Sequence, residues 1–156
     1  FDLTDEAISQ GLANTEWPGR FEILQRQPPV VVDSAHTPGA ITRLQETLDE
    51  FFPGRRLHLI LGMSADKDIQ GMLAALKSPI AKIYCTQAPH PRAMTPAALA
   101  DAARFLERPV TAIANPGDAL EAALNEAQNG DLVLVTGSIF IAASGRIAWF
   151  ERSNLE

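Results

Sequence analysis

The sequence predicts an α/β fold built on a mostly parallel sheet. Apolar β-branched runs alternate with helical patterns along almost the whole chain, and many of the connections are short. This alternation is typical of a parallel sheet with right-handed crossover helices on both faces. The near-continuous apolar runs 57–61 and 132–135 suit central strands buried on both sides. We therefore expect a Rossmann-like, three-layer α/β/α domain with about six strands.

The N-terminal half is expected to begin with a helix and a hairpin. Thr4 is a good N-cap for the helix, and a tight polar turn joins the two strands of the hairpin, which adds one antiparallel edge strand. Apolar residues at helical spacing follow Pro38, and the Pro53-Gly54 pair ends that helix. The expected elements are helix 4–13, strands 21–24 and 29–33, helix 38–52, strand 57–62 and helix 68–76.

The C-terminal half continues the alternation of strand and helix. Thr95 is an N-cap residue and Pro96 occupies the first helical position after it. The segment 138–150 is apolar throughout, and we interpret it as a helix. The expected elements are strand 82–86, helix 95–107, strand 110–114, helix 116–127, strand 131–136 and helix 138–150.

Composition limits the classes of function. The chain has 156 residues, 46% of them hydrophobic and 21% charged, which fits one soluble globular domain. A net charge of −6 without a Lys/Arg cluster argues against nucleic acid as the main partner. No apolar run is long enough for a membrane span. The single cysteine, Cys85, lies in a strand-like run and is expected to be a small buried side chain. A free cysteine and no signal peptide favour the cytoplasm.

Several common motifs are missing. The chain has no phosphate-binding loop of the G-x-x-x-x-G-K-[ST] type, no G-x-G-x-x-G and no G-x-S-x-G. His36, His58 and His90 lack the spacing of a zinc site, so no metal ligands are expected here, and His58 inside a strand is interpreted as structural. A receiver-like or flavodoxin-like module would need an acidic pair or a phosphate loop that is also missing.

The most informative stretch follows the strand at 29–33. Asp33 and His36 stand where this strand turns into the next helix. In open α/β sheets, ligands bind beyond the carboxyl ends of strands. Because a buried acid is costly unless it is paired, we expect Asp33 to meet solvent or a hydroxyl-bearing ligand. The sequence thus predicts a polar binding site at this edge.

Six short motifs occur in a fixed order along nearly the whole chain. They are WPGRFE at 17–22, DSAHTP at 33–38, FPGRR at 52–56, GMSADKD at 62–68, APHPRA at 88–93 and VTGS at 135–138. Together they resemble the C-terminal domain of the bifunctional folylpolyglutamate synthase/dihydrofolate synthase family, within the Mur ligase superfamily. The folate enzymes usually read D-G-A-H-N where this chain has Asp33-Ser34-Ala35-His36-Thr37, and the muramyl-tripeptide synthetases read D-Y-A-H-T-P.

The resemblance implies an ATP-dependent ligase that adds L-glutamate to dihydropteroate, to folylpolyglutamate or to both. An acyl phosphate forms first, and the amine of glutamate then attacks it. The family's N-terminal domain carries the P-loop and the Mg²⁺ ligands, so ATP, Mg²⁺ and that domain are implied partners. On this basis residues 1–16 are a lead-in helix from the interdomain region and 17–152 form the ligase domain, which alone is expected to be inactive. A monomer is expected.

The resemblance also implies roles for residues at the nucleotide side of the site. Arg20 would contact the ATP phosphates, where a guanidinium fork matches phosphate oxygens. Asp33 would accept hydrogen bonds from the ribose hydroxyls, since Thr37 is better placed than Asp33 to cap the next helix. His36 would contact nucleotide or glutamate, with a structural histidine as the alternative. Arg20, His36 and Lys67 are the predicted catalytic residues.

Other residues are assigned to the amino acid. Lys67 would contact a phosphate or the glutamate carboxylate, unless it lies in a solvated turn, while Asp68 is expected to cap the next helix. His90, Arg92 and Ser138 are predicted to bind glutamate, with helix capping as the alternative for Ser138. Two other functions remain open, a muramyl-peptide synthetase domain of the same superfamily and a non-catalytic α/β binding module.

Overall fold

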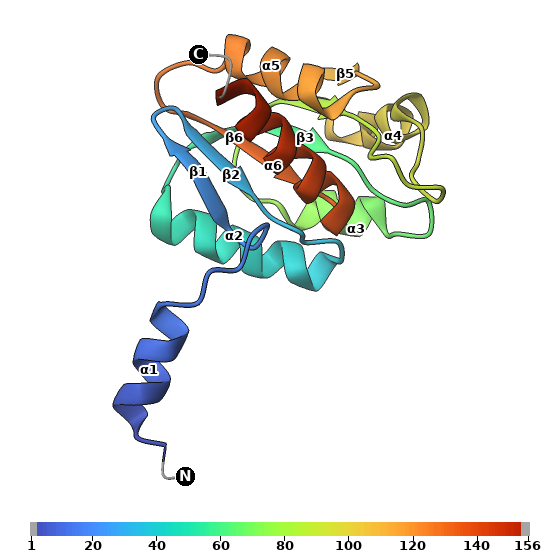
Figure 1. Ribbon diagram of the computed structural model, residues 1–156. Coiled ribbons are helices and arrows are strands. Elements are labelled where there is room, and N and C mark those ends of the chain that lie inside the picture. Colours follow the sequence, from blue (N-terminus) through green and yellow to red (C-terminus); the bar gives the residue numbers. More distant parts are fainter. Residues whose placement is uncertain (1–2, 154–156) are drawn as a thin grey trace.

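A six-stranded sheet forms the centre of the computed structural model, which describes residues 3–153 (Figure 1). The strand order is β1-β2-β6-β3-β4-β5; β1 and β2 are antiparallel, and every other neighbouring pair is parallel. This arrangement confirms the predicted fold class, including the antiparallel edge strand. The strands are β1 (Glu22–Arg26), β2 (Pro29–Val32), β3 (Arg56–Leu61), β4 (Ile80–Cys85), β5 (Val110–Ala112) and β6 (Asp131–Thr136).

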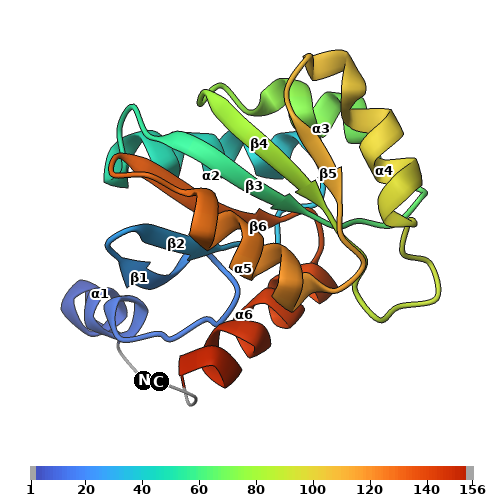
Figure 2. The same cartoon turned by 90° about the horizontal axis from the view of Figure 1, so that it is seen from above.

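Helices cover both faces of the sheet (Figure 2). One face carries α2 (Pro38–Phe51), α3 (Ile69–Ala75) and α4 (Pro96–Ala103), and the other carries α5 (Pro116–Glu126) and α6 (Ile139–Ser153). Helix α1 (Asp5–Ala13) projects from the body and buries none of its residues (Figure 1). No helix among residues 3–153 is long and apolar enough to cross a membrane.

The observed elements follow the expected order, and several of their ends differ by a few residues. Strand β4 begins at Ile80 instead of residue 82, and the helix expected to reach residue 107 ends at Ala103, followed by a 3₁₀ turn over Arg104–Leu106. The apolar tail does form a helix. It packs so closely on β6 that a Cβ at Gly145 would lie 2.8 Å from Cγ1 of Val135. This contact buries Ile141, Ala142, Gly145 and Trp149 of α6, whereas the apolar residues Ile139, Phe140, Ile147 and Phe150 of the same helix are exposed.

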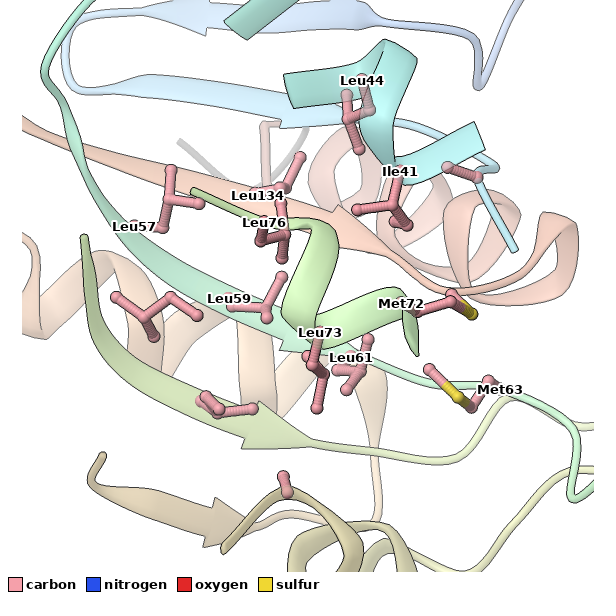
Figure 3. Packing of buried hydrophobic residues seen from close by; sticks show 14 of the residues in the cluster. Ile41, Leu44, Leu57, Leu59, Leu61, Met63, Met72, Leu73, Leu76 and Leu134 are labelled. Carbon is pink, nitrogen blue, oxygen red and sulfur yellow. The ribbon is translucent and has the colours of Figure 1, made fainter. Parts of the chain in front are cut away.

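The larger of the two hydrophobic cores lies between the sheet and helices α2, α3 and α4. Leu57, Leu59 and Leu61 of β3 point into it together with residues of α2 and α3, as Figure 3 shows. Leu59 is completely buried, as is Cys85, and burial raises the pKa of the Cys85 thiol to about 12. The cysteine is therefore a buried packing residue, as expected.

A network of hydrogen bonds centred on Asp131 lies at the amino edge of the sheet. Asp131 accepts two hydrogen bonds from Arg56 (2.9 and 3.0 Å), one from the backbone N–H of Gln128 (2.9 Å) and one from Nε2 of His58 (3.1 Å). The other ring nitrogen of His58 lies 3.0 Å from the Tyr84 hydroxyl, so His58 is structural, as predicted. The hydrogen bond from Arg56 is the main reason why the pKa of Asp131 falls to about 2.

This network predicts a specific acid sensitivity. Because the folded state lowers the Asp131 pKa, the carboxylate stabilises the fold above about pH 4, and its contribution of about 2 kcal/mol is lost as the pH falls towards 2. In Asp131→Asn this part of the pH dependence should be missing from the free energy of unfolding, measured in urea between pH 2 and 7. Glu46→Gln, which breaks the exposed Arg43–Glu46 ion pair, should keep the wild-type profile. Identical profiles for wild type and Asp131→Asn would contradict the assignment.

Candidate active site

Five connections meet at the carboxyl edge of the sheet. The loops after β2, β3, β4 and β6 leave this edge because these strands are parallel, and the turn before antiparallel β1 reaches it from the other direction. The structure therefore brings all the predicted site residues to one edge. They are Arg20, Asp33, His36, Lys67, His90, Arg92 and Ser138.

The Asp33 carboxylate joins the turn before β1 to the loop after β2. Its Oδ2 accepts a hydrogen bond from the backbone N–H of Phe21 (2.8 Å), and its Oδ1 accepts one from Ala35 (2.7 Å). Phe21 has a φ of +43°, which is unusual for a non-glycine residue. Asp33 is partly exposed, in line with the expectation that it meets solvent or a ligand, and its carboxylate also holds backbone, which the sequence did not predict. Each oxygen keeps a further lone pair that can accept from a hydroxyl.

Arg20 precedes β1 on a braced turn. The turn is fixed to α6 because Glu22 accepts hydrogen bonds from the Gly19 backbone N–H (2.8 Å) and from Nε of Arg146 (2.8 Å). The Arg20 side chain is exposed, and its guanidinium carbon lies 5.8 Å from the centre of the Trp17 ring. An exposed guanidinium on a fixed turn is suited to an anionic ligand.

His36 presents a proton acceptor to solvent. Its Nδ1 lies 2.9 Å from the Ser34 carbonyl oxygen, which can only accept, so Nδ1 carries the proton. In the neutral ring Nε2 is then an acceptor. Thr37 caps α2 through the backbone N–H of Ala40 (3.2 Å), which confirms the preference for Thr37 over Asp33 as the cap.

Ser34 is the point where the sequence departs from the usual folate motif. Its hydroxyl is buried and has no hydrogen-bond partner in the structure. A buried unpaired hydroxyl costs free energy, whereas a glycine would bring no polar group to this place. The substitution is therefore unfavourable for the stability of the loop itself.

The loops after β3 and β4 are joined by backbone hydrogen bonds. Ser64 and Ala93 form an isolated antiparallel bridge, and the Ala65 N–H donates to the Arg92 carbonyl (3.3 Å). This junction holds the loop of Lys67 against the exposed Arg92, and Asp66 lies 3.5 Å from Nζ of Lys67. A hydrogen bond with its own backbone N–H lowers the pKa of Asp66, and the Lys67 and Arg92 charges lower it further. Lys67 and Asp66 therefore form an ion pair in this loop. Asp68 caps α3, as expected.

The ring nitrogen that His90 leaves for a ligand is a donor, whereas that of His36 is an acceptor. Its Nδ1 accepts the backbone N–H of Arg92 (3.2 Å), so in the neutral ring Nε2 carries the proton and is a donor. His90 also borders a surface cavity of about 650 Å³ between the β4–α4 loop, the start of α5 and α6. Sequence reasoning did not predict these opposite tautomers, because each depends on a backbone contact inside a loop.

Ser138 lies where β6 turns into α6. Its Oγ accepts the backbone N–H of Ile141 (3.1 Å), so the capping alternative is confirmed, and the hydroxyl proton remains able to donate to a ligand. The preceding Gly137 has a φ of +115°, and a Cβ there would lie 2.8 Å from the Gly62 carbonyl oxygen. Among residues 3–153, no three His, Cys, Asp or Glu side chains gather as a metal site would require.

Residues 19–139 match the family model described as Mur ligase, glutamate ligase domain. The chain is 38% identical over 152 residues to a probable bifunctional folylpolyglutamate synthase/dihydropteroate synthase from Haloferax volcanii, covering 95% of this chain and 18% of that protein. The chain therefore spans less than a fifth of that relative's length.

Two solved structures share this fold. The Mycobacterium tuberculosis folylpolyglutamate synthase complexed with ADP and AMPPCP has a TM-score of 0.86 and 31% identity, covering 94% of this chain and 35% of that one. A bifunctional folylpolyglutamate synthase/dihydrofolate synthase with Mn, AMPPNP and L-glutamate bound has a TM-score of 0.78 and 30% identity, covering 97% of this chain and 36% of that one.

The two backbone contacts of Asp33 predict a structural role besides any role in binding. Asp33→Ala leaves the N–H groups of Phe21 and Ala35 without this acceptor, which should lower the free energy of unfolding by about 1–3 kcal/mol. The measurement is urea unfolding of the 156-residue chain. Asp101→Ala is the control, because this exposed helix residue holds only a surface ion pair and should change stability by less than about 0.5 kcal/mol. Equal stability of the two variants would show that Asp33 does not hold the loop.

Proposed function

This chain belongs to the family of Mur ligase glutamate ligase domains, and from that premise we propose that it is the C-terminal domain of an ATP-dependent ligase in folate metabolism. The proposed enzyme joins L-glutamate to dihydropteroate, to folylpolyglutamate or to both, through an acyl phosphate. The observation that carries the proposal is the gathering of Arg20, Lys67 and Arg92 around the carboxyl edge, beside two histidines of opposite tautomer. Such an edge suits a reaction between anionic substrates.

The nucleotide half of the proposed site is Arg20, Asp33 and His36. The free lone pairs of Asp33 fit ribose hydroxyls, and the exposed guanidinium of Arg20 fits phosphate oxygens. When ATP is bound with Mg²⁺, it supplies the phosphoryl group that activates the substrate carboxylate. We propose that the Mg²⁺ ligands and the P-loop lie on an N-terminal domain. Relatives solved with ADP, or with AMPPNP and Mn, support a role for nucleotide and a divalent cation in the reaction.

The amino-acid half of the proposed site is Lys67, His90, Arg92 and Ser138. Arg92 presents a planar fork of donors that matches a carboxylate, and His90 adds a donor at Nε2. Lys67 contributes a second positive charge from the joined loop, and the Ser138 hydroxyl a further donor. These groups would hold and orient glutamate so that its amine meets the acyl phosphate.

We propose a monomeric, cytoplasmic enzyme in which residues 17–152 form the ligase domain. Residues 1–16, of which the structure describes 3–16, would connect it to the N-terminal domain, because α1 projects from the body and buries none of its residues (Figure 1). The net charge of −6 supports small molecules as partners in preference to nucleic acid.

The proposed activity is tested with the full-length protein. ATP, L-glutamate and either dihydropteroate or a reduced folate should give ADP and a glutamylated product, and omission of any one substrate should abolish both. Product detection by mass spectrometry identifies the acceptor. Hydrolysis of ATP without dependence on glutamate, or no product with either acceptor, would overturn the proposal.

Arg20 should act mainly on turnover. If its guanidinium neutralises charge on the transferring phosphoryl group, Arg20→Ala lowers kcat/KM by about 10²-fold, chiefly through kcat. Arg20→Lys keeps the charge without the fork and should recover part of the loss. Steady-state kinetics of the full-length enzyme give these values. Arg108→Ala, an exposed arginine just before β5 at the opposite edge, should behave as wild type. Wild-type kcat in Arg20→Ala would remove Arg20 from the site.

A further inference from the structure

An aromatic ring of α6 lies against His90. The centroids of the Phe140 and His90 rings are 4.0 Å apart, and the ring planes are inclined by 22°. Phe140 comes from the first turn of α6 and His90 from the loop after β4, so the contact joins two connections of the carboxyl edge. Phe140 is 41% exposed, so this contact adds little to the hydrophobic core.

Phe140 and Arg92 hold the imidazole of His90 in two different ways. The Arg92 N–H fixes the tautomer by donating to Nδ1 (3.2 Å), and the Phe140 ring covers one face of the imidazole. The proton on Nε2 has no acceptor among the described residues and remains available to a ligand. Fixing a side chain before binding removes part of the entropy that binding would otherwise lose.

The backbone of this loop does not depend on Phe140. The N–H of Ala93 donates to the His90 carbonyl (3.0 Å), and the bridge between Ser64 and Ala93 fixes the loop to the segment after β3. Loss of the Phe140 ring should therefore release the imidazole while the loop keeps its course. A substitution at Phe140 can therefore test the position of the His90 ring without unfolding the loop.

We propose that Phe140 is a positioning residue for the carboxylate of the amino-acid substrate, acting through His90. It keeps the imidazole plane fixed so that the Nε2 proton and the Arg92 guanidinium serve the same carboxylate. The inference rests on the proposed function, because it takes His90 and Arg92 as glutamate-binding residues. Phe140 itself need not touch the substrate.

The first test is NMR of the 156-residue chain itself. In the wild type, the ¹⁵N shifts of the His90 ring at neutral pH should report one tautomer, protonated at Nε2. Phe140→Leu should let the imidazole turn away from the Arg92 N–H, so that the shifts move towards a mixture of tautomers, whereas Phe140→Tyr, which keeps the ring, should resemble the wild type. Phe105→Leu is the matched control, since Phe105 is 46% exposed and lies in the 3₁₀ turn after α4.

The second test is kinetic and uses the full-length enzyme. Phe140→Leu should raise KM for L-glutamate by about 3- to 10-fold, the loss expected when one side chain must be ordered on binding. KM for ATP should stay at the wild-type value, and Phe140→Tyr should restore KM for glutamate. His90→Ala and Arg92→Ala should both raise KM for glutamate more than Phe140→Leu does.

The outcomes separate the two proposals. If His90→Ala and Arg92→Ala raise KM for glutamate but Phe140→Leu leaves both KM and the tautomer unchanged, the positioning role of Phe140 is wrong. If neither His90→Ala nor Arg92→Ala affects glutamate, the assignment of these residues under the proposed function fails. Equal increases in KM for glutamate and for ATP in Phe140→Leu would indicate general disruption and would also overturn the inference.

Discussion

The position of β6 between β2 and β3 is the constraint on which the candidate site depends. Strand β6 is buried along its whole length, and its last residues hold the neighbouring connections by backbone hydrogen bonds. The Val135 carbonyl accepts the N–H of Asp33 (2.9 Å), and Gly137 donates to the Ala35 carbonyl (3.1 Å). A Cβ at Gly137 would meet the Gly62 carbonyl oxygen, so no other residue allows this close contact. Strand β6 thus holds the loops after β2, β3 and β6 next to one another at the carboxyl edge.

A charged side chain is buried and paired at the amino edge of the sheet, whereas others are exposed at the carboxyl edge. At the amino edge, the Asp131 carboxylate is almost fully buried and has four donors, an arrangement that serves stability. At the carboxyl edge, Arg20 and Arg92 are exposed on braced loops, and His36 and His90 each keep one ring nitrogen for a ligand. Buried polar groups must be satisfied within the protein, as at Asp131, whereas the exposed donors and acceptors of the carboxyl edge are free to meet a ligand where open α/β sheets usually bind one.

The sequence predicted the elements and the edge of the site because both follow from local patterns. Caps at Thr37 and Thr95 and the apolar runs of β3 and β6 determine where the chain turns, and parallel strands bring their ends together. The contact of Asp33 with Phe21 and the stacking of Phe140 on His90 could not be predicted, since they join residues 12 and 50 positions apart. Such contacts depend on the packed structure.

A crystal structure of the full-length protein with L-glutamate and a non-hydrolysable ATP analogue tests the central claim most directly. The account predicts that the carboxyl edge of this domain faces both ligands, with the ribose on Asp33, the phosphates near Arg20, and the glutamate carboxylate on His90 and Arg92. Binding of glutamate or nucleotide away from this edge, with these four side chains left in solvent, would contradict it.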